Sequence, residues 1–483
     1  MEKNNELKVL FVSSEVVPFV KTGGLADVAG FLPQEIKKQG HDVRVVMPEY
    51  TQQIDDEYLS KTEDMLHFRT NVAWRDEYVG VDKIENNGVP TYLIDNKSQF
   101  ERDNLYDNPD KHVQFAYFCR AVLEMLPKID FQPDIIHCND WQTGPLGAML
   151  KTQYKQYDFY KDIKNIFTIH NLRYQGQFGM EILADTLALS PDLLPKIEHN
   201  NQINYMKTGI SFADAVNTVS KTYAEEIQTP EFGEGLDYVL RYRSADLYGI
   251  VNGIDYDEYD PATDDRIYAN YDAHDLAGKK ENKLCLQEEM GLPQDEDIPV
   301  ISIISRLVPQ KGLDLIAEVI DDMMKEDLQF VMLGTGNEEY EEMFKAAAEK
   351  YPDKLAANIE YDVDLAQKIY ASSDMFLMPS QYEPCGLGQL FSLRYGTIPI
   401  VRETGGLNDT IQSYNANTGA GNGFSFSHYD AQDMLYTIRR ALRYYKNEPK
   451  VWEKLVKRAI KSDYSWYNSA QEYIELYELI QED

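Results

Sequence analysis

Short, almost wholly apolar runs recur along the chain, and most of them are followed by a polar or glycine-containing loop and then by a segment with helical spacing. Runs of this kind are typical of parallel strands that are covered on both faces. We predict such strands at residues 7–13, 42–47, 134–138, 165–170, 214–219, 300–304, 330–333, 375–378 and 399–401. This alternation predicts an α/β protein built on doubly wound sheets.

Two regions depart from that alternation. Residues 51–108 contain segments of alternating polarity, such as Tyr78-Val-Gly-Val81, which predict an antiparallel insertion. Near the C-terminus, a helical spacing with one apolar face is formed by Trp466, Ala470, Tyr473, Tyr477 and Ile480. We expect this last helix, at 462–483, to dock on the first part of the chain.

The strand–helix pattern comes in two series, which predicts two domains. A chain of 483 residues is too long for one ordinary core. We expect a first domain at 1–248, completed by the helix at 462–483, and a second at 249–461. Thr22-Gly-Gly-Leu-x-Asp27 recurs as Thr404-Gly-Gly-Leu-x-Asp409, which favours two similar doubly wound domains.

Composition narrows the range of partners. A net charge of −34 argues against nucleic acid and anionic membrane surfaces as ligands, but it permits a neutral glucan. The four cysteines are scattered without a CxxC pair, which favours a reduced, cytoplasmic protein without structural zinc. We expect no signal peptide and no membrane span, because no apolar run has the required length.

The second series carries charged residues at strand ends. Glu383 follows the strand at 375–378, and we expect Pro384 to lie in the first turn of the next helix. The N–H groups of Cys385, Gly386 and Leu387 would then face an oxygen-rich ligand. The alternative is an ordinary capped helix start.

A second strand-to-helix loop of this series carries two cations, Arg306 and Lys311. Fixed cations are one of two ways to balance a diphosphate leaving group, the other being a metal held by carboxylates. Two Asp-x-Asp pairs, Asp255/Asp257 and Asp362/Asp364, are interpreted as turn and capping residues, so no metal site is predicted.

The first series offers fewer specific signals. Lys21 precedes Gly23-Gly24 at a predicted helix start, but the dinucleotide fingerprint Gly-x-Gly-x-x-Gly is absent. Asp140 and Trp141 follow one strand, as a carboxylate beside an indole would in a sugar site, or as a cap beside a core residue. His170 ends the next strand, where a structural role is the alternative to a functional one.

Taken together, these motifs resemble those of the bacterial glycogen synthases and plant starch synthases, nearly from end to end. The resemblance is carried, in the family's order, by Lys21-Thr-Gly-Gly-Leu-Ala-Asp-Val28, Asp140-Trp-Gln142, Thr168-Ile-His-Asn171, Asn252-Gly-Ile-Asp255, Ser305-Arg306 with Gln310-Lys-Gly312, Glu383-Pro-Cys-Gly-Leu387 and Thr404-Gly-Gly-Leu407. It implies the GT-B architecture, with two facing Rossmann-like domains and a deep cleft between them. It also implies retaining transfer of glucose from ADP-glucose to the non-reducing 4-hydroxyl of an α-1,4-glucan.

The resemblance also implies roles for single residues. Arg306 and Lys311 would stabilise the leaving ADP, Glu383 would hold the glucosyl unit, and the backbone carbonyl of His170 would face the reacting carbon. Asp140 would shape the sugar side of the site. Further donor contacts would come from Lys21, Gly24, Tyr361, Cys385, Gly386, Leu387, Thr404 and Gly405, and acceptor contacts from Trp141 and Asn171. ADP-glucose is a substrate here, and neither a cofactor nor a metal is expected.

Two positions depart from the family's usual pattern. Asn139 stands where His is usual, which leaves the acceptor contacts open, and Gly388 stands where Thr is usual, which loosens a helix start. Two other functions compete with glucosyl transfer. A glucan phosphorylase would need a pyridoxal-phosphate lysine and normally a longer chain, whereas a silent glucan-binding scaffold would have no need of Lys21, Arg306, Lys311 and Glu383.

Overall fold

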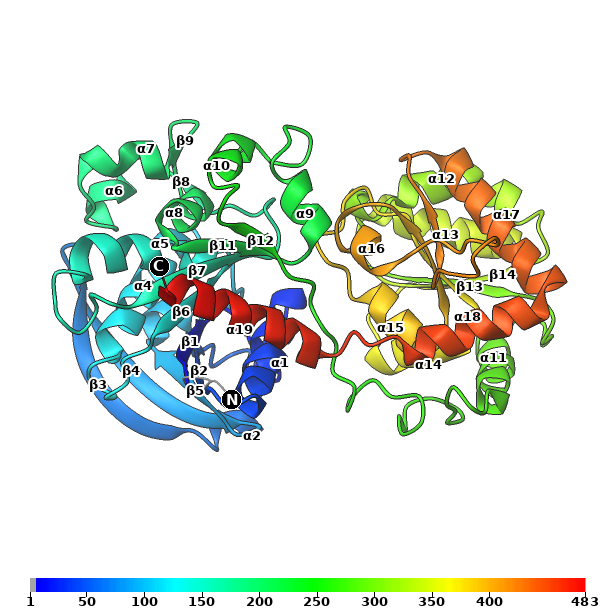
Figure 1. Cartoon of the computed structure of the whole chain (residues 1–483), viewed down its shortest axis with the longest axis horizontal. Coiled ribbons are helices and arrows are strands. Elements are labelled where there is room, and N and C mark those ends of the chain that lie inside the picture. The colour runs from blue at the N-terminus through cyan, green and yellow to red at the C-terminus, as the bar shows by residue number, and fades with distance from the viewer. Residues whose placement is uncertain (1–5, 483) are drawn as a thin grey trace. The chain divides into compact units, whose positions relative to one another are not determined.

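The computed structural model describes residues 6–482, and the chain divides into two compact units (Figure 1). The first unit runs to Gly253 and resumes at Trp466, and the second is Ile254–Ser465. These changes fall slightly later than the expected boundaries at 248/249 and 461/462. Ser469 Oγ donates to the carbonyl of Val251 at 2.7 Å, which keeps that segment with the first unit.

The first unit is built on one mixed sheet. Its strand order is β12-β11-β7-β6-β1-β2-β5-β4-β3, with parallel pairing from β12 to β5 and antiparallel pairing in β5-β4-β3. The antiparallel insertion is therefore confirmed, as an extension of one sheet edge. The strands are β1 (Lys8–Val12), β2 (Asp42–Pro48), β3 (Glu63–Val72), β4 (Arg75–Asn86), β5 (Val89–Asp95), β6 (Ile135–Asn139), β7 (Lys164–Ile169), β11 (Ala215–Thr218) and β12 (Leu247–Gly249).

Helices cover this sheet, which explains the apolar strands. Four of the five residues of β1 are buried, and β6 is buried throughout. The longer helices of the unit are α1 (Gly24–Lys38), α4 (Lys111–Met125), α5 (Asp140–Met149), α8 (Tyr205–Phe212) and α19 (Trp466–Glu482).

Helix α19 lies against α1 and packs its apolar face on the first unit (Figure 1). All five residues of the predicted apolar stripe are buried. Tyr477 Oη lies 2.7 Å from His137 Nδ1 on β6, and Tyr473 Oη accepts from Asn217 Nδ2 on β11 at 2.9 Å. Buried aromatics with satisfied hydroxyl groups hold a helix strongly, so α19 forms part of the first unit's core.

The second unit has a six-stranded parallel sheet in the order β15-β14-β13-β16-β17-β18. Its strands are β13 (Val300–Ile304), β14 (Gln329–Leu333), β15 (Leu355–Asn358), β16 (Met375–Met378), β17 (Ile398–Arg402) and β18 (Phe424–Phe426). Its helices are α11 (Ala277–Glu289), α12 (Leu313–Met323), α13 (Glu338–Lys350), α14 (Val363–Ser372), α15 (Gly388–Arg394), α16 (Gly405–Thr410), α17 (Ala431–Asn447) and α18 (Pro449–Lys461).

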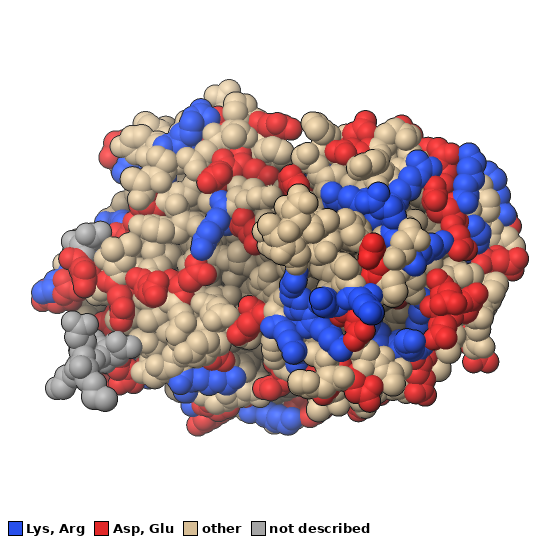
Figure 2. Space-filling model, turned by 45° about the vertical axis from the view of Figure 1, so that its right-hand side comes forward, with Lys and Arg blue, Asp and Glu red and all other residues tan. Residues whose placement is uncertain are grey.

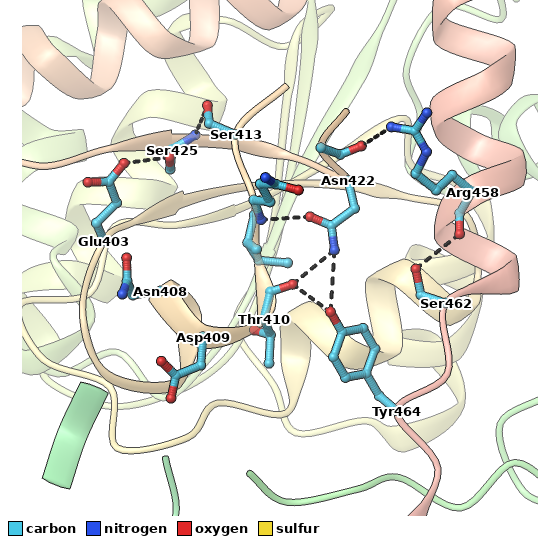
Figure 3. Close-up of a pocket in the computed structure, with 13 residues that line it drawn as sticks. Glu403, Asn408, Asp409, Thr410, Ser413, Asn422, Ser425, Arg458, Ser462 and Tyr464 are labelled. Carbon is cyan, nitrogen blue, oxygen red and sulfur yellow. Dashed lines mark hydrogen bonds between the residues drawn. The ribbon is translucent and has the colours of Figure 1, made fainter. Parts of the chain in front are cut away.

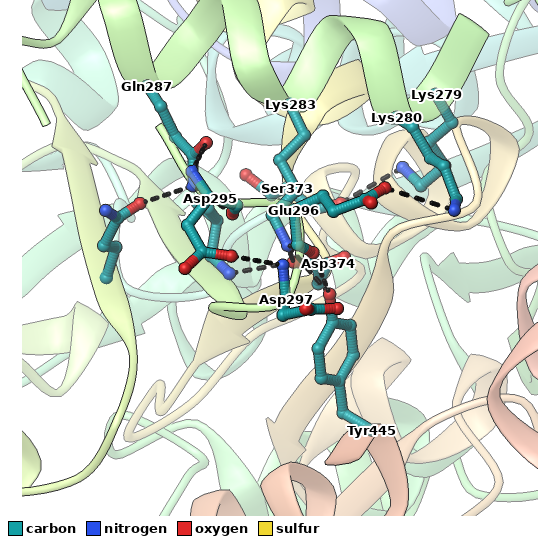
Figure 4. Close-up of polar contacts among 12 residues, drawn as sticks. Lys279, Lys280, Lys283, Gln287, Asp295, Glu296, Asp297, Ser373, Asp374 and Tyr445 are labelled. Atoms are coloured by element: carbon teal, nitrogen blue, oxygen red, sulfur yellow. Dashed lines mark hydrogen bonds and ion pairs between the residues drawn. The ribbon is translucent and has the colours of Figure 1, made fainter. Parts of the chain in front are cut away.

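Two lysines of α11 fix the N-terminal end of β16 (Figure 4). Lys279 Nζ donates to the carbonyls of Ala371 and Ser373 at 3.1 Å, and burial lowers its pKa to about 7. Lys283 Nζ lies 2.9 Å from the carboxylate of Asp374. These contacts anchor the strand at the end opposite to its loop with Glu383.

The surface carries both the basic and the acidic side chains that the composition contains. On the face that Figure 2 shows, Lys and Arg gather in several groups, each bordered by acidic side chains. Among residues 6–482, the helices are too short or too polar to cross a lipid bilayer.

Candidate active site

A cavity of about 190 Å³ lies where the strand order of the second unit reverses. The chain leaves β13 toward β14 on one side and returns to β16 on the other, so the loops after β13 and β16 diverge. Ligands of open α/β sheets bind in the crevice outside such a switch point. Residues from the ends of both strands line the cavity, among them Ser305, Arg306, Lys311, Ser380 and Glu383.

The loop that carries Lys311 is tied to the loop that carries Glu383. The N–H of Gln381 donates to the carbonyl of Gln310 at 2.9 Å. Gly312 has a φ of 70°, and a Cβ there would lie 2.0 Å from the carbonyl oxygen of Pro379. Only glycine permits both that backbone conformation and that approach, so the sequence fixes the spacing of the two loops.

A pair of glycines, Gly405 and Gly406, supports the Glu383 loop from behind. The N–H of Gly406 donates to the carbonyls of Glu383 and Pro384, each at 3.1 Å. A Cβ on Gly405 would lie 2.0 Å from the Glu383 carbonyl oxygen. Thr404, Gly405 and Cys385 are buried and lie outside the set of residues that line the cavity. Their predicted donor contacts stay predictions, and the structure gives these residues a supporting position.

Three charged side chains define the electrostatics of the cavity. Lys311 Nζ lies 2.7 Å from Glu383 Oε2, and the side chains are 17% and 8% exposed. Ser380 Oγ donates to the same carboxylate oxygen at 2.9 Å. Arg306 is exposed, and among the described residues its guanidinium has no hydrogen-bond or ion-pair partner. The cavity therefore offers one unpaired cation and one neutralised pair.

The helix after Glu383 begins later than predicted. Helix α15 starts at Gly388, so Pro384 lies in the preceding loop and the expectation that it occupies the first helical turn is wrong. The reason is Gly386, whose φ of 73° is left-handed and interrupts a right-handed helix. Gly386 and Leu387 line the cavity through this loop.

The structure also explains the departure at Gly388. A Cβ there would lie 3.0 Å from a ring carbon of Phe376 and 3.3 Å from the hydroxyl of Tyr370. Both contacts are tight, so glycine suits the packing of this chain at the start of α15. Tyr361 lies apart from these residues: it is 82% exposed and does not line the cavity, so its donor contact stays a prediction.

The first unit has its own switch point, between β1 and β6. There Asp140 Oδ1 accepts from the backbone N–H of His170 at 2.8 Å. Asp140 is thus no helix cap: it occupies the first helical position and binds the end of the next strand. Burial raises the pKa of its carboxyl to about 7, opposed by hydrogen bonds from the backbone of His170 and Asn171. Its contact with a sugar stays a prediction.

His170 is held by side chain as well as backbone. Its Nε2 lies 2.8 Å from Asn139 Oδ1, and burial lowers its pKa to about 3. The side chain of Asn171 makes a contact within its own loop: its Oδ1 accepts from the N–H of Arg173 at 3.1 Å. The sequence correctly indicated that His170 and Asp140 lie at neighbouring strand ends, but it did not indicate that the side chain of Asn139 contacts His170.

Trp141 proves to be a core residue. It is 6% exposed; its ring packs edge-on against Phe115, with a centroid distance of 5.1 Å, and at a tilt against Phe178. A Cβ on Gly176 would lie 2.3 Å from the indole. The structure thus places this indole in the core, as the core alternative holds, and its acceptor contact stays a prediction.

The Lys21 loop shows residues that the sequence did not single out. Lys21 Nζ lies 2.7 Å from Asp27 and borders a cavity of about 500 Å³ that Tyr106 also lines. The carboxylate of Glu15 accepts from the N–H groups of Thr22 and Gly23 and from Tyr106 Oη. The N–H groups of Thr22 and Gly23 at this helix start are thus already occupied by Glu15, whose pKa is raised by burial.

Gly24 is the first residue of α1, and its donor contact stays a prediction. The two Thr-Gly-Gly-Leu motifs are also alike in structure, since each begins a helix within its glycine pair: α1 begins at Gly24, the second glycine of its motif, and α16 at Gly405, the first glycine of its motif. A signal that would have revealed Glu15 is its position directly after the first strand, on a loop that returns to that same helix start.

A larger cavity of about 760 Å³ lies beside the ends of β17 and β18 (Figure 3). Its basic side chain, Arg458, donates to the carbonyls of Gly421 and Gly419. The cavity therefore lacks a cation ready for phosphate, and size alone does not make it the better candidate. Among the described residues, no cluster of three or more His, Cys, Asp or Glu side chains is arranged to hold a metal. Asp362 caps α14, as predicted.

Comparison with known families covers both units. Residues 8–242 match the model of the starch synthase catalytic domain, and residues 288–461 match that of glycosyl transferases group 1. A protein named glycogen synthase from Moorella thermoacetica is 52% identical over 477 residues, covering 98% of this chain and 97% of the relative. Glycogen synthase from Clostridium novyi is 50% identical over 474 residues, covering 98% of each.

Solved structures give the same result. The catalytic domain of starch synthase IV from Arabidopsis thaliana, bound to ADP and acarbose, superposes with a TM-score of 0.91 at 34% identity, covering 99% of this chain and 100% of that one. Sucrose-phosphate synthase from Thermosynechococcus elongatus shares the fold, with a TM-score of 0.60 at 17% identity and coverage of 98% of each chain. The fold is thus that of the GT-B glycosyltransferases.

Proposed function

The chain belongs to the family of bacterial glycogen synthases and plant starch synthases, and from that premise we propose how its residues act. It is a glycosyltransferase that elongates glycogen with glucose from ADP-glucose. We propose that the acceptor is the non-reducing 4-hydroxyl of an α-1,4-glucan and that the anomeric configuration is retained.

The observation that carries the mechanism is the charge arrangement at the second unit's switch point. Arg306 presents an unpaired guanidinium beside the Lys311–Glu383 pair. A departing diphosphate gains negative charge, and fixed cations stabilise it most where the site is already organised. Arg306 is free to bind the phosphates bidentately, and Lys311 divides its donors between Glu383 and the phosphate.

Glu383 acts as an acceptor for glucosyl hydroxyls. Lys311 and Ser380 both occupy Oε2, which orients the carboxylate and leaves Oε1 toward the ligand. The cavity of about 190 Å³ is smaller than the ~300–1,000 Å³ typical of whole-ligand pockets, so it holds the diphosphate and glucose rather than the entire donor.

The chemical step is a front-face displacement. The bond between the glucosyl carbon and the phosphate oxygen breaks, the bond to the acceptor oxygen forms on the same face, and the acceptor proton passes to the departing phosphate oxygen. The backbone carbonyl of His170 faces the positive charge that develops on the sugar, and Asp140 holds that backbone in place. Lys21 and Asn171 add contacts to donor and acceptor.

We propose that the reaction needs no metal and no cofactor, because Arg306 and Lys311 supply the cations that a metal would otherwise provide. A cytoplasmic location is proposed because none of the four cysteines forms a disulfide in the described structure. Reduced thiols agree with that location, and the reaction depends on neither the thiols nor the location.

The test is nucleotide release with glycogen as acceptor, using ADP-glucose or UDP-glucose, with and without EDTA. We expect ADP release that EDTA does not diminish, and roughly 10²-fold less in Arg306→Ala. Lys325→Ala is the matched control, since that lysine pairs with Asp322 on the surface. Full activity of Arg306→Ala would contradict the leaving-group assignment, and loss of activity in EDTA would contradict metal independence.

A further inference from the structure

The side chain of Asn139 connects three strands around His170. Its Nδ2 donates to the carbonyl of Val12 on β1 at 3.0 Å and to that of His137 on its own strand, β6, at 3.3 Å. Its Oδ1 lies 2.8 Å from Nε2 of His170, at the end of β7. Asn139 itself is fully buried, so water does not compete for these contacts.

These contacts determine the orientation of the amide. Backbone carbonyls only accept hydrogen bonds, so the NH₂ group of Asn139 must face Val12 and His137. The amide oxygen must then face His170. Because an amide oxygen only accepts, the Nε2 of His170 must carry the proton in that hydrogen bond.

The surroundings keep the ring neutral. Burial lowers the pKa of His170 to about 3. The titratable groups around it are Asp140, which binds its backbone N–H, the buried and neutral His137, and Glu15, whose charge acts on Asp140. A neutral imidazole has one N–H, so a proton on Nε2 leaves Nδ1 as an acceptor.

We propose that Asn139 is a positioning residue that holds His170 as the neutral Nε2–H tautomer, so that Nδ1 accepts a hydrogen bond from a hydroxyl of the bound sugar. The proposal rests on glucosyl transfer as the function and adds to it a residue that contacts no substrate. A protonated His170 would repel the positive charge that develops on the sugar, and the other tautomer would present a donor to the hydroxyl oxygen.

In this arrangement the type of residue at position 139 affects how the tautomer of His170 is set. Histidine, usual in the family at this position, must itself adopt one tautomer before it can accept from His170. Asparagine has a fixed acceptor and does not titrate. The tautomer of His170 in this chain is therefore independent of the protonation of residue 139.

The direct test is the protonation state of the His170 ring, measured by two-bond ¹H–¹⁵N correlation on the full chain labelled with ¹⁵N-histidine. The chain has eight histidines, and the spectrum of His170→Gln identifies the signals of His170. We expect a protonated Nε2 and a bare Nδ1 from pH 6 to pH 8. A proton on Nδ1, or a doubly protonated ring, would overturn the proposal whether or not the protein transfers glucose.

Variants separate positioning from simple packing. Asn139→Leu removes the acceptor at similar volume, and we expect a mixture of tautomers. Asn139→His is the conservative variant, whose ring is able to donate to Val12 and accept from His170, and it should keep the Nε2–H tautomer. Asn217→Leu is the matched control, because Asn217 is equally buried on β11 and does not contact His170.

A double-mutant cycle tests the kinetic consequence. Asn139→Leu should lower kcat/KM roughly 10-fold, but have little effect when His170 is already Ala, because the two side chains act through one contact. Equal losses in both backgrounds would show a structural role only and overturn the proposal. If Asn139→Leu does not fold, the cycle is made with Asn139→Ser, and the parent spectrum decides the tautomer. An inactive parent with the Nε2–H tautomer would count against the function and not against the proposal.

Discussion

Replacing Lys311 by Met and replacing Arg306 by Ala remove cations from one cavity, but the two variants should differ in stability. Lys311 forms a 2.7 Å ion pair with Glu383 that is mostly buried, whereas the exposed Arg306 has no partner among the described residues. Both lose a cation that stabilises the leaving group, so we expect each to reduce turnover by roughly 10²-fold, or ~2.7 kcal/mol.

The stability difference follows from the burial of the pair. Removing one partner of a fully buried ion pair costs about 3–5 kcal/mol, because the other charge remains without compensation. Lys311 is 17% exposed, and Ser380 still donates to Glu383, so we expect about 2–3 kcal/mol for Lys311→Met. An exposed, unpaired side chain changes stability by about 0.5 kcal/mol or less. The double variant Lys311→Met/Glu383→Gln should regain at least half of the loss.

The assay is urea unfolding of the second unit, followed by the fluorescence of Trp452, which lies in that unit's core. The chain has four tryptophans, and subtracting the signal of Trp452→Phe isolates this one. Because the chain has two units, the midpoint of this transition is compared and not a global free energy. Equal midpoints for Lys311→Met and Arg306→Ala would refute the reasoning.

Three further predictions concern Gly405, Glu49 and Tyr477. Gly405→Ala should displace the loop of Glu383 and lower activity at least 10-fold, because its Cβ would lie 2.0 Å from a backbone oxygen; Gly419→Ala, also at positive φ but with nothing within 4 Å of its Cβ, is the control and should keep full activity. Glu49→Gln should stabilise the first unit increasingly as the pH rises above the ordinary glutamate range, as measured by thermal unfolding from pH 5 to 9. Burial and nearby carboxylates raise the folded pKa of Glu49, so the parent's stability is greatest at low pH and is lost as the pH rises through that pKa; a pH-independent difference would contradict this. Tyr477→Phe should lower the free energy of unfolding by about 1 kcal/mol, because it removes the hydrogen bond between α19 and His137 on β6. Tyr467, on the same helix, is half exposed, so Tyr467→Phe should change that free energy little in the same unfolding assay.

Much of the fold could be predicted from periodicity alone. The apolar runs became strands within a residue or two of the predicted bounds, because a parallel strand must be apolar on both faces and that requirement is written locally. The placement of Arg306, Lys311 and Glu383 at strand ends followed from the same pattern. Their meeting in one cavity depends on the strand order, which no local pattern contains.

One wrong prediction, for Pro384, and two environments that the sequence did not indicate, those of Asp140 and Trp141, share a cause. Pro384 suits a first helical turn by propensity, but the left-handed Gly386 delays the helix to Gly388. Asp140 and Trp141 have the composition of a sugar site, yet one binds a neighbouring strand's backbone and the other fills the core. In each case the residue type was compatible with several environments, and a contact distant in sequence selected one.

By itself, the sequence determined the two α/β series, the antiparallel extension, the apolar face of the last helix and, through its motifs, the family. Only the tertiary structure decided that Arg306 is unpaired while Lys311 is neutralised by Glu383, that Glu15 occupies the first helix start, and that Asn139 faces His170. Secondary structure depends on the spacing of apolar residues, which is read along the chain. The charge state and tautomer of a side chain depend on burial and on partners that folding brings from distant strands.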